Sequence, residues 1–375
     1  MRQPWLGGLS RRDFLRRHWQ KRPLLARAAW AVPAGLPRRA GLFALACRSD
    51  VESRLVLRRA ARWQVEHGPF SRDRLRRLPA SRWTLLVNGV NLHVLAAEQL
   101  LRRVDFVPQA RLDDVMVSYA APGGGVGPHF DSYDVFLLQG AGRRLWRLQR
   151  ARRFALVPEA PLKLIADFSP DEEYLLEPGD VLYLPPGWGH DGIALEPCWT
   201  YSIGCRAPGG AELALALLDY LHERGLPDAE YRDRALRPAA HSAEIGARMI
   251  GFAQRALRRL RWTARDVRRL LGRHLTAPKP HVAFAPPRRP LARAAFLRRL
   301  ARGDVALDAR SLLLYRGRLF FLNGEEIVLR PAQRRALARL ADRRRCAGAA
   351  LARAGLGEQL FAWYRYGYLR LERRA

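Results

Sequence analysis

The region between Asp113 and Arg206 limits the possible folds more than any other part of the chain. It consists of short segments rich in β-branched and aromatic residues, and turn-forming residues separate them. The segments are DDVMVSYA, YDVFLLQG, RRLWRLQR, EYLLEPGDVLYLPP and CWTYSIGCR. Strands of this length and spacing are typical of a closed antiparallel barrel. We therefore predict a β-barrel in this region.

Three potential metal ligands lie within the predicted barrel. His129 and Asp131 are two residues apart, so on a strand they point to the same face and can hold one ion from one side, while His190 can complete the set from a neighbouring strand. Two histidines and one carboxylate form the facial triad of mononuclear non-haem iron oxygenases, which leaves positions free for cosubstrate and dioxygen. A structural zinc site would use four protein ligands, and no paired cysteine spacing supports one here.

Residues on either side of His129 and Asp131 narrow the chemistry further. The glycine-rich run from 123 to 127 lacks the GKS/T ending of a phosphate-binding loop and leads into a strand, so we predict a tight turn. An oxygenase that uses 2-oxoglutarate also needs a cation for the distal carboxylate, which a guanidinium binds at two points. Arg143 and Arg144 are both candidates, and they point to opposite faces of their predicted strand.

Helices are predicted on the N-terminal side of the barrel. Residues 10–22 place apolar side chains at helical spacing, with Ser10 as a potential N-cap and Pro23 at the end. Residues 83–87 form a predicted buried strand, and residues 90–101 form a predicted apolar helix. These elements would pack beside the barrel.

The pattern changes after about Pro208, where the predicted strands stop. Helices are predicted over residues 211–224, 242–261 and 263–274, and Ser242 and Thr263 are potential N-caps. A proline-rich linker covers residues 279–290. Beyond it, helices and two short strands suggest a winged-helix module. The arginines between residues 330 and 345 could bind nucleic acid, but without a defined recognition helix we favour a solvated or protein-binding face.

The formal net charge of +31 restricts the possible partners. It results from 66 basic and 35 acidic residues, an excess expected of a protein that meets nucleic acid or a nucleic-acid-rich assembly. Nearly all the basic residues are arginine, and the coding bias of a GC-rich genome is an alternative explanation for that preference. Such bias does not by itself explain the excess over acidic residues.

The sequence predicts a soluble cytoplasmic protein. The four cysteines are scattered without a disulfide framework, and no apolar run approaches the ~18 residues of a membrane span. The segment from Ser10 to Leu15 resembles a twin-arginine export signal. Charged residues follow it where the apolar part of a signal should lie, so we expect no export.

Several long motifs carry a resemblance to a known family. They are DFLRRHWQKRP, SRLV followed by WQVEHGPF, PGGGVGPHFDSYDVFLLQGAGRRLWR, LEPGDVLYLPPGWGH and YSIGCRAP. The chain resembles the bacterial JmjC-type ribosomal oxygenases, which hydroxylate an arginine of the large-subunit ribosomal protein L-sixteen. The resemblance is dense from about Asp13 to Pro208, and beyond that point it depends on the order of the domains.

The resemblance implies a fold of the α+β class in three parts. Residues 1–208 would form a JmjC catalytic domain, which is a double-stranded β-helix of the cupin type with N-terminal helices. Residues 209–278 would form a helical dimerisation region, so a homodimer is expected. Residues 279–375 would form a winged-helix-like domain.

The resemblance also implies roles for single residues. His129, Asp131 and His190 match the Fe(II) ligands, and Arg144, rather than Arg143, matches the residue that anchors 2-oxoglutarate. Four weaker candidates complete the predicted site: Thr200 and Ser202 as further cofactor contacts, and Tyr133 and Asp134 as substrate contacts.

The implied activity is hydroxylation of an arginine β-carbon with Fe(II), 2-oxoglutarate and O2. One alternative is a JmjC oxygenase that acts on a histidyl residue or another substrate. Another is a non-catalytic cupin that binds the ribosome or nucleic acid, which the complete ligand set disfavours. A basic enzyme repels a cationic substrate unless acidic residues line the entrance or the positive surface meets ribosomal RNA. The candidate acidic residues are Asp113, Asp114, Asp134 and Asp191.

Overall fold

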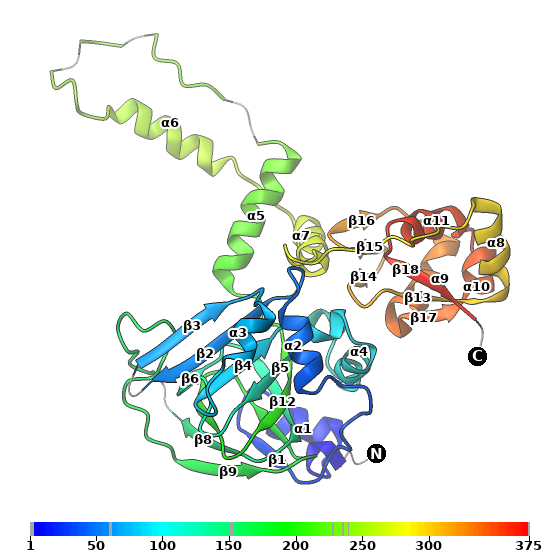
Figure 1. Ribbon diagram of the computed structural model, residues 1–375. Coiled ribbons are helices and arrows are strands. Elements are labelled where there is room, and N and C mark those ends of the chain that lie inside the picture. Colours follow the sequence, from blue (N-terminus) through cyan, green and yellow to red (C-terminus); the bar gives the residue numbers. More distant parts are fainter. Residues whose placement is uncertain are drawn as a thin grey trace.

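The computed structural model describes residues 4–59, 62–150, 153–226, 229–234, 236–238 and 240–373. Its N-terminal part is a barrel of two antiparallel sheets (Figure 1). The larger sheet has the order β1 (Leu24–Ala26), β10 (Val181–Leu184), β7 (Asp134–Ala141), β12 (Cys198–Cys205), β5 (Leu112–Ala120), β4 (Trp83–Val87), β2 (Ser53–Arg59) and β3 (Arg62–His67). The smaller sheet has the order β6 (His129–Phe130), β11 (Trp188–Ala194), β8 (Arg144–Arg150) and β9 (Glu172–Leu176). The predicted double-stranded β-helix is confirmed.

Short helices cover the outer face of the larger sheet. They are η1 (Pro4–Leu6), α1 (Arg11–Arg17), α2 (Arg39–Ala46), α3 (Arg72–Arg76), η2 (Val90–Leu92), α4 (Leu95–Arg102) and η3 (Gln109–Arg111). Ser10 caps α1 as predicted, because its hydroxyl accepts from the Asp13 amide. The predicted continuous helix over residues 90–101 is wrong. Val94 is extended and separates η2 from α4, which agrees with the lower helix propensity of β-branched residues.

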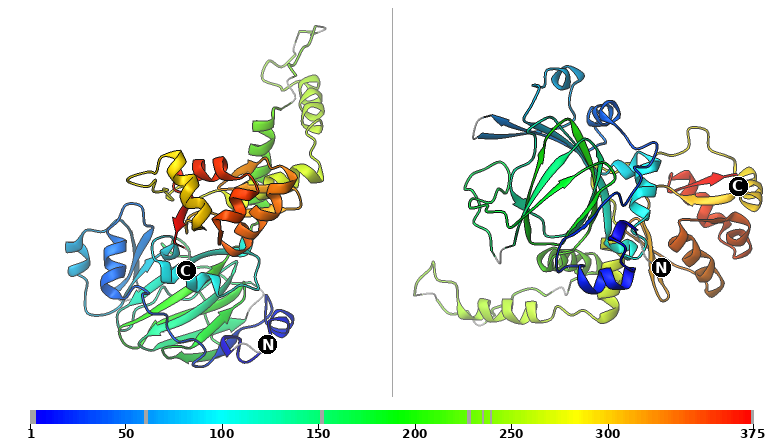
Figure 2. Two further views of the ribbon diagram at one scale, coloured as in Figure 1. Left: turned by 90° about the vertical axis from the view of Figure 1, so that its right-hand side faces the viewer. Right: turned by 90° about the horizontal axis from the view of Figure 1, so that it is seen from below.

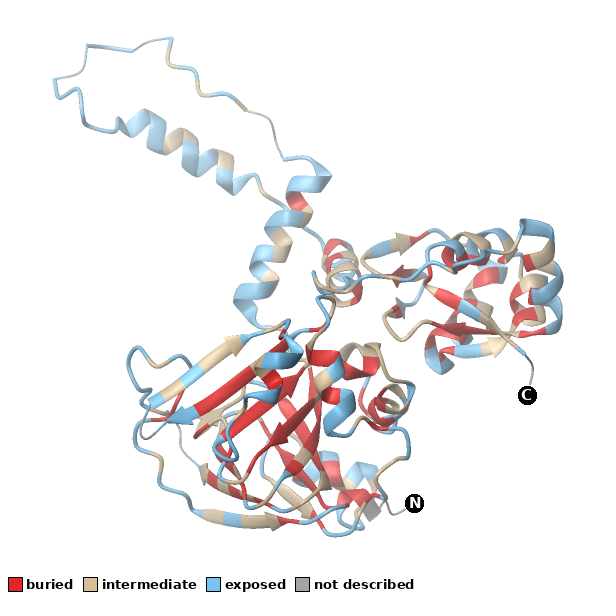
Figure 3. Cartoon of the chain, in the orientation of Figure 1, coloured by how far each residue is buried: buried red, intermediate tan, exposed pale blue. Residues whose placement is uncertain are grey.

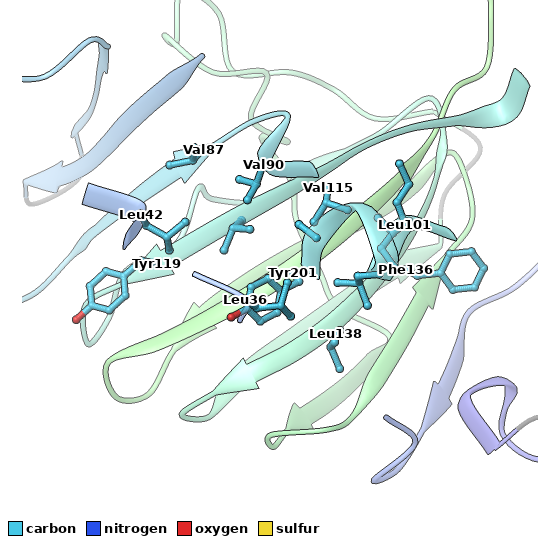
Figure 4. Packing of buried hydrophobic residues seen from close by; sticks show 14 of the residues in the cluster. Leu36, Leu42, Val87, Val90, Leu101, Val115, Tyr119, Phe136, Leu138 and Tyr201 are labelled. Atoms are coloured by element: carbon cyan, nitrogen blue, oxygen red, sulfur yellow. The ribbon is translucent and has the colours of Figure 1, made fainter. Parts of the chain in front are cut away.

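The main core lies between this larger sheet and the covering helices. Figure 4 shows side chains from β4, β5, β7 and β12 meeting Leu36, Leu42 and Leu101 from the helical side. Burial of each large apolar side chain contributes roughly 1.5–3 kcal/mol. The opposite face of the same strands is then free to line the inside of the barrel.

The next segment begins with α5 (Gly210–Arg224) and α6 (Ala247–Arg258), which project away from the barrel (Figure 1). It ends with α7 (Ala264–Thr276), which lies against the C-terminal part of the chain. Thr263 caps α7 as predicted. The prediction for the middle helix was wrong at its start: α6 begins after Gly246, so Ser242 is not its cap. Among the described residues of α6, none is buried, and Figure 3 shows the helix in the colours of exposed and intermediate residues.

The C-terminal part is a separate α+β unit beside the barrel (Figure 2). Its sheets are β17 (Arg345–Ala347), β13 (Asp304–Leu307) and β18 (Leu369–Glu372), and β14 (Leu313–Arg316), β15 (Leu319–Leu322) and β16 (Glu325–Ile327). Its helices are α8 (Arg293–Arg302), α9 (Pro331–Arg343), α10 (Gly348–Arg353) and α11 (Gly357–Arg365). The buried guanidinium of Arg344 joins this unit to α4 of the barrel domain through Glu98, 3.2 Å away.

Within the described ranges, no helix combines the length and the apolar character that a membrane crossing needs.

Candidate metal centre

The three predicted ligands meet inside the barrel. β6 pairs with β11 so that His129 lies directly opposite His190, and Asp131 follows the last residue of β6. The two imidazole rings have centroids 4.2 Å apart, and His190 Nε2 lies 3.7 Å from Asp131 Oδ2. One ligand atom from each of the three residues lies within 4.8 Å of the others. This spacing suits a single ion held from one side.

The hydrogen bonds of both rings leave the correct atom free for a metal. His129 Nδ1 lies 2.9 Å from the Gly127 carbonyl, and His190 Nδ1 lies 3.0 Å from the Trp188 carbonyl. A carbonyl only accepts, so each Nδ1 carries a proton, and Nε2 is the ring nitrogen left to face a metal. Such outer contacts fix ring orientation in metal sites.

The charge state of His190 also suits a ligand. Burial, together with the neighbouring His129 and against the opposing charge of Asp131, lowers the pKa of His190 well below its ordinary value. The ring is therefore neutral at physiological pH. Because metals bind the unprotonated imidazole, no proton has to be removed when an ion enters.

A solvent-connected cavity of about 600 Å³ surrounds these ligands. The triad lies on its wall, together with residues from β2, β4, β5, β8 and β12, so both sheets contribute to it. A volume of this size is typical of small-molecule and cofactor sites. The cavity can accept a cosubstrate beside the metal and a side chain that enters from outside.

Arg144 lies on this cavity and Arg143 does not. Arg144 is 4% exposed, whereas Arg143 is on the surface and pairs with Glu196. The Arg144 Nη1 donates to Ser118 Oγ at 3.1 Å, while its Nε and Nη2 are buried without a hydrogen-bond partner among the described residues. Burying unpaired groups of a guanidinium is costly. A carboxylate in the cavity would satisfy both groups at once.

The weaker candidates divide into two pairs. Tyr133 and Ser202 line the cavity. The other two lie away from the cavity wall. Thr200 is fully buried and its hydroxyl donates to Gln139 Oε1, away from the cavity wall. Asp134 is fully buried in the barrel wall, where it accepts from Tyr183 and pairs with Arg111 at 3.2 Å. Its carboxylate already has its partners.

The acidic residues expected at the entrance are partly present. Asp113 and Asp114 line the cavity, whereas Asp191 is buried and pairs with Arg147. Asp114 accepts a hydrogen bond from the Gly89 amide at 2.7 Å. Burial, and then the charge of Asp113, raise the pKa of Asp114 to about 6. The carboxylate is therefore ionised at neutral pH and close to its titration point.

Several cavity residues were missed by the sequence analysis. Ser118 has the same strand phase as Met116, and both line the cavity, so alternation along β5 could have found them. Arg54 of β2, Thr84 of β4 and Lys279 of the segment after α7 come from distant parts of the chain. No local motif marks these three residues.

A double-stranded β-helix with two histidines and one carboxylate inside it defines a cupin-type protein built to hold one non-haem metal ion. Residues 99–213 match the family model described as JmjC domain, and residues 259–370 match the model described as ROXA-like winged helix. The chain belongs to the JmjC-domain ribosomal oxygenases, since it is 36% identical over 84% of its length to a member of that family.

That relative is the ribosomal protein uL16 3-hydroxylase of Escherichia coli K12, of which the match also covers 84%. A probable ribosomal oxygenase of Haemophilus influenzae is 37% identical over 53% of this chain and 50% of its own length. The X-ray structure of E. coli ycfD superposes with a TM-score of 0.82 at 34% identity, covering 97% of this chain and 98% of that one. A structure of ycfD in complex with cobalt and 2-oxoglutarate superposes with a TM-score of 0.80, at the same identity and coverage.

Proposed function

We propose that this chain is an Fe(II)- and 2-oxoglutarate-dependent hydroxylase that acts on an arginine β-carbon of ribosomal protein uL16. The name of the E. coli relative supports the substrate, and the ycfD complex with cobalt and 2-oxoglutarate supports the cofactors. The observation that carries the proposal is the pair of unsatisfied N–H groups of Arg144, buried on the same cavity as the metal-ligand set.

In this proposal the chain's residues have separate tasks. His129, Asp131 and His190 hold the metal on one side, and Arg144 receives the distal carboxylate of 2-oxoglutarate with both free N–H groups. Ser118 fixes the guanidinium, and Ser202 lines the same cavity. Fe(II) with 2-oxoglutarate and O2 supplies oxidative decarboxylation of the cosubstrate coupled to C–H hydroxylation. The ring centroid of Trp146 lies 5.9 Å from that of His190, and this aromatic ring helps to exclude water from the metal end of the cavity.

The entrance of the cavity suits a cationic side chain. Asp113 and Asp114 place negative charge there, and Tyr133 offers an aromatic face and a hydroxyl. A guanidinium can bind carboxylates at two points and stack on an aromatic ring. These groups offset locally the repulsion expected between a basic enzyme and an arginine substrate.

The proposal also divides the chain into three domains with separate roles. Residues 1–208 form the catalytic domain, residues 209–278 a dimerisation region and residues 279–375 a winged-helix domain. Exposed apolar side chains on α5 and α6 support a homodimer: Leu215, Leu218, Met249, Ile250 and Leu257. Mass measurement of the particle in solution tests this arrangement, because a monomer would contradict it. We also propose a cytoplasmic location, because the proposed substrate belongs to the ribosome.

A contact with ribosomal RNA would use the excess positive charge. Arg335, Arg339 and Arg343 follow one another every four residues along α9, and all three are exposed. Phosphate groups would replace the repulsion among these like charges with attraction, and such binding weakens steeply with salt. An affinity for ribosomal RNA that does not change with salt would contradict this contact.

Intact-mass analysis of ribosomal proteins tests the central proposal. Ribosomal proteins incubated with enzyme, Fe(II), 2-oxoglutarate and O2 should contain one uL16 species heavier by one oxygen atom, and fragmentation should place that atom on an arginine. A shift on a different protein or on a histidine would replace the substrate and keep the chemistry. No shift on any protein, together with no succinate release, would leave a non-catalytic cupin.

A further inference from the structure

One lysine enters the candidate active site from outside the barrel. Lys279 follows α7 in the segment that leads to the C-terminal unit, and it lines the same cavity as the triad. Its Nζ lies 2.9 Å from Asp113 Oδ1. The lysine side chain is 47% exposed and that of Asp113 is 35% exposed, so the pair lies at the cavity entrance.

The surroundings keep this lysine charged. Burial alone would lower the pKa of Lys279, but the charges of Asp114, Asp113 and Glu52 leave it above its ordinary value. The ammonium group therefore interacts with both acidic residues at the cavity entrance, Asp113 and Asp114. A cation of the protein itself occupies the place that suits the cationic side chain of a substrate.

We propose that Lys279 is a specificity-determining residue, a resident cation that an arginine side chain must displace from Asp113 and Asp114 before it reaches the metal. This inference rests on the proposed function, because it requires a cationic substrate. A neutral side chain cannot replace the ammonium charge. A guanidinium replaces it and adds a second hydrogen bond, which the point-like ammonium cannot do in the same geometry.

The local backbone favours movement of the side chain alone. Lys279 stands between Pro278 and Pro280, and proline fixes its own φ and restricts the residue before it. The four-carbon stem of the lysine is flexible, and almost half of the side chain already faces solvent. An incoming side chain can therefore move the ammonium into water while the main chain keeps its place.

Peptide binding to full-length variants tests the role of Lys279. Calorimetry without O2, with Fe(II) and 2-oxoglutarate present, measures the Kd of an arginine peptide copied from uL16 and of its citrulline counterpart. Lys279→Met keeps the aliphatic stem and removes the charge, so it should lower the Kd of the arginine peptide about two- to fivefold, the range of one partly exposed ion pair. Lys279→Arg should raise this Kd, because a guanidinium holds Asp113 more firmly.

Lys21→Met provides a matched control, since Lys21 is exposed, donates to the Arg16 carbonyl and does not line the cavity. It should leave both Kd values unchanged. Hydroxylation of the arginine peptide by the wild type is measured in parallel by mass spectrometry. If the wild type hydroxylates the peptide but Lys279→Met binds it equally or less tightly, the role of Lys279 is overturned alone. If the wild type neither binds nor hydroxylates it, the proposed substrate is overturned, and the role of Lys279 with it.

Discussion

The two ends of the cavity are built in different ways. At the inner end, His129, His190 and Arg144 lie on paired strands of the smaller sheet, where the backbone ladder fixes their positions. At the entrance, Asp113 and Asp114 at the start of β5 meet Lys279, which is more than 160 positions away in the sequence. The ligand-binding side chains at the inner end are therefore held in place before a ligand binds. The entrance is already occupied by a charge pair, so it can select what enters.

Removing a metal ligand should have the largest effect on turnover, because the two remaining ligands cannot replace its bond to the metal. His129→Ala or Asp131→Ala should reduce iron-dependent succinate release by at least about 100-fold, since even outer partners of metal ligands are worth 10–100-fold. Metal content and succinate release are measured on the same samples. The exposed His67→Ala provides a histidine control. Normal turnover in either ligand variant would show that the metal is held elsewhere.

The two neighbouring arginines offer the next largest effect. Arg144→Ala should raise the KM for 2-oxoglutarate by about 10–100-fold, the loss expected for charge-assisted hydrogen bonds to a buried carboxylate. Arg143→Ala changes the same residue type one position away on the exposed face and should leave the KM unchanged. A raised KM in Arg143→Ala but not in Arg144→Ala would mean that the cosubstrate does not bind at the inner end of the cavity.

Peptide binding at the cavity entrance should depend on pH through the charge of Asp114. The pKa of Asp114 is raised to about 6, so the carboxylate is charged above that pH and neutral below it. Affinity for an arginine peptide should therefore fall roughly five- to tenfold between pH 7 and pH 5, the loss of one partly enclosed ion pair. Burial is the main cause of the raised pKa; of the charged groups that face Asp114, Asp113 and Glu52 raise the pKa further and Lys279 lowers it.

Binding of peptide, rather than turnover, is the correct measurement for this effect, because turnover also depends on the chemical steps that follow binding. Asp114→Asn should show weak binding at both pH values and no step near pH 6.

The raised pKa of Asp114 also affects the pH dependence of folding stability. The folded state binds the proton of Asp114 more tightly than the unfolded state, so this contribution to stability is lost as pH rises through about 6, and Asp114→Asn should remove that loss. A step that persists in Asp114→Asn would assign the titration to another group.

The same contrast explains what could be predicted from the sequence. The inner end follows from local rules: residues two apart share a strand face, and the barrel follows from strand spacing, so the triad and the opposite directions of Arg143 and Arg144 were accessible. The placements of Asp134 and Thr200 did not follow from these rules. Asp134 lies on the same side of β7 as Phe136, which belongs to the core under the covering helices, and Thr200 is closed off from the cavity by its hydrogen bond to Gln139. The position of Lys279 depends on how the segment after α7 crosses the barrel, which no local pattern encodes.

Ser118 offers the smallest effect and the finest test of the inner end. Its hydroxyl accepts a hydrogen bond from Arg144 Nη1, while Nε and Nη2 have no partner among the described residues, so the serine orients the guanidinium and does not itself bind the cosubstrate. Ser118→Ala should raise the KM for 2-oxoglutarate only about two- to tenfold, because one hydrogen bond to a charged group is lost and the charge remains. Ser118→Thr keeps the hydroxyl and should recover most of the affinity. An effect as large as that of Arg144→Ala would mean that the serine itself binds the carboxylate, and the inner end would then depend on two anchors instead of one.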